Sequence, residues 1–217
     1  MRRELPVAQR ISQRGVVAVL MIDRVEDAVP VARALLDGGV DVMELTLRTD
    51  AAMDALRVVK AEVPEMLAGV GTILTAAQVE AVTKAGADFG VAPGVNSRVV
   101  QAAQEVGLPF SPGIMTPSDI EAAVELGCEV LKFFPASSSG GLKHLANIAA
   151  PYQHLGLRYI PLGGIKQDNM GEYLSSKLIA AIGGSWLASK QLIAAHDWQG
   201  ITANAAAAVA VVDQARS

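Results

Sequence analysis

The chain has 217 residues, enough for one domain with a sizeable core. Hydrophobic residues make up 51% of it but aromatic residues only 4%, so the core must consist mainly of Ala, Val, Leu and Ile. A net charge of −4 argues against a nucleic-acid-binding protein, and a single cysteine, Cys128, excludes an internal disulfide. The longest apolar run, residues 16–22, is too short to span a bilayer. Residues 1–6 lack the apolar segment of a signal peptide, so we expect a cytoplasmic protein.

Short apolar runs alternate with segments of helical spacing along the whole chain. A short amphipathic helix is expected over residues 5–13, ended by Gly15. The predicted strands are residues 16–22, 40–46, 67–71, 88–92, 109–111, 129–134, 158–162 and 178–182. The predicted helices are residues 25–37, 50–63, 75–85, 97–106, 117–126, 141–150, 167–175, 186–195 and 199–215.

This strict alternation of strand and helix indicates an α/β protein with a parallel sheet. Eight strand–helix units in 217 residues indicate a closed (β/α)8 barrel. No stretch resembles a linker, so we expect a single domain over residues 1–217, with a short N-terminal helix and an extra C-terminal helix. The alternative is an open, doubly wound sheet.

One predicted strand carries a lysine in the run Glu129-Val130-Leu131-Lys132-Phe133-Phe134-Pro135. Side chains alternate between the two faces of a strand, so Val130, Lys132 and Phe134 share a face. Lysine is seldom buried without a partner or a task, and in a water-poor place it can act as a nucleophile. The alternative is a lysine that extends to solvent from the strand end.

Active sites of such barrels lie at the carboxyl ends of the strands. The second predicted strand places Glu44 on the same face as Val42 and Thr46, with Arg48 in the loop beyond. If that face is the inner one, a carboxylate enters the barrel mouth; the alternative is a structural ion pair with Arg48. Thr72, after the third strand, would present a hydroxyl there.

Glycine pairs follow the last two predicted strands, at Gly163-Gly164 and at Gly183-Gly184-Ser185 before a helix. Glycine lets backbone N–H groups approach a ligand, and a helix N-terminus favours an anion, so these loops indicate a phosphate site. The alternative is two turns that simply need glycine. The three histidines have no ligand spacing, so we expect no metal.

Together, Lys132, Glu44 and an anion site indicate an amine nucleophile that acts on a carbonyl compound. The lysine would form a protonated imine, which accepts electrons when the adjacent C–C bond breaks. A carboxylate must move protons, and Glu44 is the only acid at a predicted mouth position.

The motifs resemble the 2-keto-3-deoxy-6-phosphogluconate (KDPG) / 4-hydroxy-2-oxoglutarate (KHG) aldolase family over nearly the whole chain. The specific ones are Glu44-Leu-Thr-Leu-Arg48-Thr49 and Lys132-Phe-Phe-Pro135-Ala136, and the glycine pairs agree. The resemblance implies a homotrimeric barrel and a class I aldolase without metal or other cofactor. It would cleave a small anionic 2-keto-3-deoxy sugar acid, namely KDPG, and also KHG, to pyruvate and an aldehyde.

The resemblance also implies the roles of individual residues. Lys132 would form the Schiff base and Glu44 would be the acid and base. The residues that would contact substrate are Arg48, Thr72, Pro93, Phe134, Gly163, Gly164, Gly184 and Ser185. The chain departs from the family at Leu162, where a threonine is usual, and this affects the choice of sugar acid.

Two other functions fit the same residues. One is a phosphate-binding barrel isomerase or epimerase that uses Glu44 as base, with Lys132 as an electrostatic clamp. The other is a non-catalytic barrel that binds a sugar acid.

Overall fold

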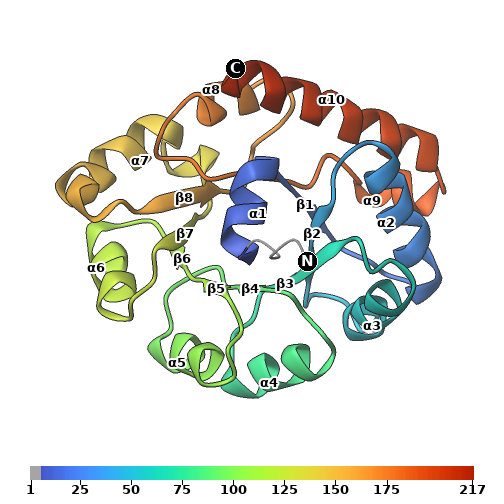
Figure 1. Ribbon diagram of the computed structural model, residues 1–217, viewed down its shortest axis with the longest axis horizontal. Helices are drawn as coiled ribbons and strands as arrows, with labels where there is room; N and C mark the ends of the chain where they lie inside the picture. Colours follow the sequence, from blue (N-terminus) through green and yellow to red (C-terminus); the bar gives the residue numbers. More distant parts are fainter. Residues whose placement is uncertain (1–5) are drawn as a thin grey trace, which may run out of the picture.

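The computed structural model describes residues 6–217, in which parallel strands curl around a central axis and helices cover the outside (Figure 1). The strands are β1 (Val16–Leu20), β2 (Val42–Thr46), β3 (Leu67–Gly71), β4 (Gly90–Val91), β5 (Phe110–Ser111), β6 (Gly113–Ile114), β7 (Val130–Phe133), β8 (Arg158–Pro161) and β9 (Ile182–Gly184). The helices are α1 (Val7–Arg14), α2 (Ala28–Asp37), α3 (Ala52–Glu62), α4 (Ala76–Lys84), α5 (Ser97–Glu105), α6 (Pro117–Glu125), α7 (Gly141–Ala149), α8 (Met170–Leu174), α9 (Lys190–Ala194) and α10 (Trp198–Arg216).

The strands form two parallel sheets, β5-β4-β3-β2-β1-β9 and β6-β7-β8. The strand order follows the chain, and the last strand pairs with the first, Val17 opposite Gly183. An isolated bridge between Tyr159 and Ile179 links the second sheet to the segment before β9. The predicted parallel α/β fold is therefore confirmed.

Two apolar layers follow from the alternation of side chains along the strands. The inner layer contains Ile11, Val17, Val42, Leu67, Phe89, Val91, Ile160, Leu162, Ala180 and Ala181. The outer layer joins the strands to the helices and includes Leu131 and Phe133 of β7. Because Val42 and Val130 pack against the inner layer, Glu44 and Lys132, two residues further along their strands, face inward too.

Local signals fix several helix ends. Thr116 caps α6 in a reciprocal capping box with Asp119, and Pro117 occupies the first turn, as that segment predicts. Gly15 ends α1 with a φ of 72°, and its N–H bonds to the Ile11 carbonyl. The predicted start of α1 at Leu5 lies outside the described residues.

No helix within residues 6–217 combines the length and the apolarity needed to cross a membrane.

The predicted fifth strand, residues 109–111, continues beyond its expected end. Pro112 has no N–H and interrupts the strand, which resumes as β6 at Gly113. The Pro112 carbonyl accepts a hydrogen bond of 2.9 Å from the backbone N–H of Lys132. The proline therefore interrupts the strand without breaking its contact with β7, because its carbonyl can still accept a hydrogen bond from the parallel neighbour.

The C-terminal third differs most from the expected boundaries. Pairing with β1 places β9 at Ile182–Gly184, so the apolar run 178–182 contributes mainly the isolated bridge at Ile179. The helix expected from Trp186 is α9, which begins only after the N-cap Ser189. The helix expected over 167–175 shortens to α8.

Tyr159 offers a test of the outer layer. Its ring is buried, and its hydroxyl has no hydrogen-bond partner among the described residues. Burial, with a smaller effect of Tyr152, raises the pKa of Tyr159 to about 12. We expect Tyr159→Phe to raise the free energy of unfolding by about 1 kcal/mol, because an unsatisfied buried hydroxyl is removed.

The same substitution should change the pH dependence of stability. In the unfolded chain, Tyr159 ionises at its ordinary pKa of about 10. In the folded protein it keeps its proton up to about pH 12, so the wild type loses stability as pH rises from about 10 towards 12. Urea unfolding at pH 8 and pH 11 should show this loss reduced in Tyr159→Phe. Tyr152→Phe is the control at pH 8, where it should not stabilise the protein, since that hydroxyl donates to Glu121 at 2.8 Å. A less stable Tyr159→Phe protein at pH 8 would contradict the expectation.

Candidate active site

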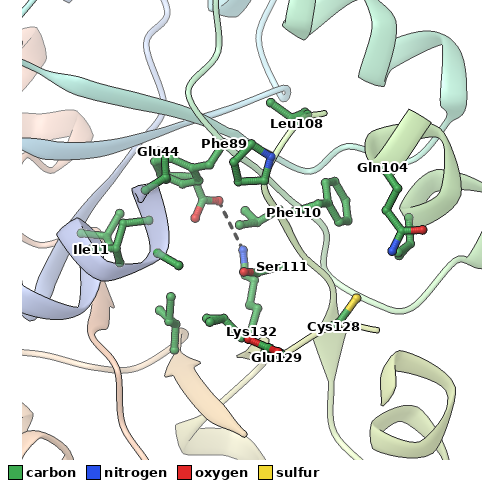
Figure 2. Close-up of a pocket in the computed structure, with 18 of the residues that line it drawn as sticks. Ile11, Glu44, Phe89, Gln104, Leu108, Phe110, Ser111, Cys128, Glu129 and Lys132 are labelled. Atoms are coloured by element: carbon green, nitrogen blue, oxygen red, sulfur yellow. Dashed lines mark hydrogen bonds and ion pairs between the residues drawn. The ribbon is translucent and has the colours of Figure 1, made fainter. Parts of the chain in front are cut away.

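The centre of the site is an ion pair inside the ring of strands. Lys132 on β7 and Glu44 on β2 are 88 residues apart in sequence, yet Lys132 Nζ lies 3.3 Å from Glu44 Oε1. The side chains are only 7% and 3% exposed, and Figure 2 shows them pointing at each other. The Lys132 ammonium also lies 5.5 Å from the centre of the Phe134 ring. An amine and a carboxylate are therefore held together out of bulk water.

Gly71 makes room for this pair. It stands at the end of β3, opposite Thr46 in the ladder between β2 and β3. A Cβ added at Gly71 would overlap Glu44 Oε1. A glycine is thus needed to let the carboxylate lie against β3, a role that the sequence did not reveal.

The end of β2 is fastened to the end of β1. Thr46 Oγ1 donates to the Leu20 carbonyl at 3.0 Å, and Thr49 Oγ1 donates to the Ile22 carbonyl at 2.5 Å. Arg48 lies between these two anchors and is exposed. The Glu44 carboxylate pairs with Lys132, so the alternative of a structural Glu44–Arg48 ion pair was wrong.

Thr72 has an unusual backbone. Its φ is 63°, in the left-handed region that a β-branched residue seldom adopts. It follows Gly71 directly and is half-buried. Strained residues of this kind persist where the surrounding structure holds them, often at functional sites.

The loop after β8 adjoins the loop after the lysine strand. The backbone N–H of Ala136 donates to the Leu162 carbonyl at 2.6 Å, and that of Ser137 to the Gly163 carbonyl at 2.9 Å. Gly163 and Gly164 have φ values of 96° and 78°, which require glycine. The first glycine pair therefore lies beside the carboxyl end of β7.

The second glycine pair has a clear packing role. A Cβ on Gly183 would overlap the Leu162 side chain, and one on Gly184 would crowd Trp186 and Leu187. Ser185 is exposed and leads into turns, with α9 starting at Lys190. The expected helix N-terminus at this point was wrong, because the chain turns before it becomes helical.

The remaining predicted contact residues lie at the strand ends. Pro93 follows β4 and is exposed, and its carbonyl sits where a Cβ on Gly113 would fall. Phe134 is 37% exposed. Leu162 is buried in the inner layer rather than packed outward against the helices.

Other reactive groups lie apart from this pair. Among residues 6–217, no three His, Cys, Asp or Glu side chains gather as a metal site would require. His144 Nε2 lies 3.1 Å from the Met115 carbonyl, and His196 belongs to a surface turn. Burial raises the pKa of the Cys128 thiol, which disfavours its reactive thiolate.

A buried lysine next to a carboxylate, inside a ring of parallel strands, is the arrangement of an enzyme that uses an amine on a carbonyl compound. The sequence agrees with that class. Residues 7–204 match the model of the KDPG and KHG aldolases, so the chain belongs to this family of lyases.

Individual relatives cover almost the whole chain. The KHG/KDPG aldolase of Escherichia coli K12 is 43% identical over 89% of this chain and 90% of its own length. The 2-dehydro-3-deoxy-phosphogluconate aldolase of Dickeya dadantii is 42% identical over 94% of this chain and 95% of its own. A crystal structure of KDPG aldolase from Legionella pneumophila, with pyruvate captured at low pH as a covalent carbinolamine intermediate, superposes with a TM-score of 0.89. That match is 35% identical and covers 93% of this chain and 97% of the other.

Proposed function

We propose that this protein is a class I aldolase that cleaves KDPG to pyruvate and glyceraldehyde 3-phosphate, with KHG as a second substrate. The observation that carries the proposal is the buried pair of Lys132 and Glu44, whose reacting atoms are 3.3 Å apart. Family membership supports it, and so does the carbinolamine of pyruvate in the Legionella relative.

The first stage of the reaction is imine formation. The unprotonated Nζ of Lys132 attacks the C2 carbonyl of the keto acid and gives a carbinolamine. The C2 hydroxyl leaves as water when Glu44, in its acid form, donates a proton to it. The product is a protonated imine between C2 and Lys132.

The second stage breaks the C3–C4 bond. Glu44 removes the proton of the C4 hydroxyl, and C4 becomes the aldehyde carbon as the C3–C4 bond breaks. The electron pair of the broken bond moves towards the imine, which becomes an enamine. A proton then returns to C3, and water hydrolyses the pyruvyl imine to release pyruvate and free Lys132. Glu44 lies close enough to Lys132 to serve both stages.

The strand-end residues bind the rest of the substrate in this proposal. Arg48, which lies between the anchored Thr46 and Thr49, would provide a positive charge for the substrate carboxylate, and the Thr72 hydroxyl would contact the same end of the substrate. The phosphate or distal end would be bound by Gly163, Gly164, Gly184 and Ser185, and Pro93 and Phe134 would contact the carbon chain.

We also infer that the two sheets form one closed (β/α)8 barrel. Only Pro112 separates β5 from β6, and the bridge from Tyr159 to Ile179 joins β8 to the segment before β9. A homotrimer and a cytoplasmic location remain predictions. The homotrimer is tested by sedimentation, which should show a particle with the mass of three 22.6-kDa chains.

The two alternatives use the site differently. An isomerase or epimerase would need Glu44 as base but no bond to Lys132, and a binding protein would need neither reaction. The direct contact between the amine and the carboxylate supports the aldolase over both.

The proposal is tested by an assay of pyruvate release coupled to lactate dehydrogenase. KDPG, its C4 epimer and KHG are supplied in turn, with and without EDTA. We expect turnover of KDPG that EDTA does not reduce. If none of these substrates released pyruvate, the proposed aldolase activity would be refuted. If EDTA abolished activity and a divalent ion restored it, the class I mechanism would be refuted.

Leu162 should influence the choice of sugar acid. Its buried, inward side chain offers no hydrogen bond, so a substrate hydroxyl directed at it loses water without gaining a partner, at about 1–3 kcal/mol. We expect Leu162→Thr to change the ratio of kcat/KM for the two C4 epimers by about tenfold. Phosphate recognition should persist, because the glycine loops are unchanged.

The control is Leu162→Val, which has the branched shape of threonine but no hydroxyl. Values of kcat/KM are measured on KDPG, its C4 epimer and a short unphosphorylated keto acid. Equal ratios in the Thr and Val variants would show that a hydroxyl at this position has no effect on specificity.

A further inference from the structure

A cavity extends from the ion pair towards the amino-terminal side of the strands. Its volume is about 320 Å³, and its walls include α1 and the segments that lead into β5 and β7. Lys132 and Glu44 line its inner end, but none of the predicted substrate-contact residues at the carboxyl ends of the strands does so. The cavity therefore shares Lys132, Glu44 and Leu162 with the proposed active site and extends from them towards the amino-terminal side of the strands.

Apolar side chains form most of this cavity. They include Ile11, Phe89, Leu108 and Phe110, which are labelled in Figure 2, and also Ile160 and Leu162. Two of them are aromatic rings, which favour edge or offset contacts with another ring. The lining thus suits an apolar ligand with a flat surface.

Few polar groups reach the cavity. At its inner end the charges of Lys132 and Glu44 are paired with each other. The hydroxyl of Ser111 lies on the wall, and the exposed side chains of Gln104 and Glu129 stand at the outer edge. A charged ligand would lose its hydration without a free countercharge, whereas a single N–H or O–H donor would find an acceptor in Ser111 or Glu44.

The cavity opens to solvent at its outer edge, where Gln104 and Glu129 are exposed. Figure 2 shows Gln104, Cys128 and Glu129 on this side, away from Ile11. A small molecule can therefore enter at this edge.

We propose that this cavity binds a small neutral aromatic molecule that carries one hydrogen-bond donor. An apolar cavity of about 150 Å³ holds benzene, so this larger one has room for a two-ring compound. Indole is the probe of choice, because it is neutral, flat and has a single N–H group.

The test is a calorimetric titration of indole into the full-length protein, with intermolecular NOEs to locate the ligand. We expect saturable binding at one site, with NOEs to the side chains of Ile11, Phe89 and Phe110. Ala8→Phe places a ring at the cavity wall on α1 and should weaken binding at least tenfold. Ala61→Phe is the control, since this alanine is also exposed and helical but does not line the cavity.

Three results would overturn the proposal. One is the absence of saturable binding to the wild type. Another is NOEs only to residues outside the cavity. The third is equal affinity for indole in Ala8→Phe and Ala61→Phe, with both proteins folded by circular dichroism.

Discussion

Lys132→Arg is expected to lose turnover by on the order of 10⁴–10⁶-fold, as for other covalent nucleophiles, while the protein stays folded. A guanidinium remains protonated, so arginine cannot form the imine. Arginine is preferable to alanine here because it keeps a positive charge near Glu44, which is only 3% exposed. Removal of one member of a buried ion pair alone costs about 3–5 kcal/mol and would confuse lost chemistry with lost stability.

The measurement is pyruvate release by the purified variant, with its thermal unfolding recorded alongside. Lys143→Arg is the matched control, because Lys143 is exposed on α7, and it should keep wild-type activity. Turnover of Lys132→Arg within tenfold of the wild type would exclude Lys132 as the nucleophile.

Glu44→Gln is expected to lower kcat by on the order of 10²–10⁴-fold, the usual contribution of a general acid and base. The carboxamide has nearly the same shape, so it should fit the space that Gly71 leaves and still accept a hydrogen bond from Lys132. It cannot shuttle protons. The loss should therefore appear in the rate rather than in the fold.

The proton step can be followed separately from cleavage. Exchange of the pyruvate methyl protons with D₂O, observed by NMR, reports the interconversion of imine and enamine. This exchange should slow in Glu44→Gln and remain normal in Glu62→Gln, a change at an exposed position of α3. Wild-type exchange and turnover in Glu44→Gln would assign the proton transfer to another group.

The central pair could be anticipated because the alternation of side chains depends only on local sequence. Val42 and Glu44 share a face of β2, and Val130 and Lys132 share a face of β7, whatever the details of strand pairing. Once both faces point inward, the ring of strands brings two residues 88 positions apart to within 3.3 Å. The roles of these residues in catalysis remain predictions.

Features that depend on tertiary pairing could not be anticipated in this way. The run 178–182 is apolar enough for a strand, but the partner β1 selects Ile182–Gly184 instead. Gly183 could be interpreted as part of an anion loop, whereas its space is filled by Leu162 from the neighbouring strand. The contact of Gly71 with the Glu44 carboxylate likewise joins two strands, and no pattern within either strand signals it.

The most direct test of the account is to trap the imine. The wild-type protein is incubated with pyruvate and sodium borohydride, digested, and mapped by mass spectrometry. We expect the mass of a reduced pyruvyl adduct on the peptide that contains Lys132, with none when pyruvate or borohydride is omitted. An adduct on Lys143 or Lys166 instead, or no adduct in an enzyme that releases pyruvate from KDPG, would contradict the assignment of Lys132 as the Schiff-base residue.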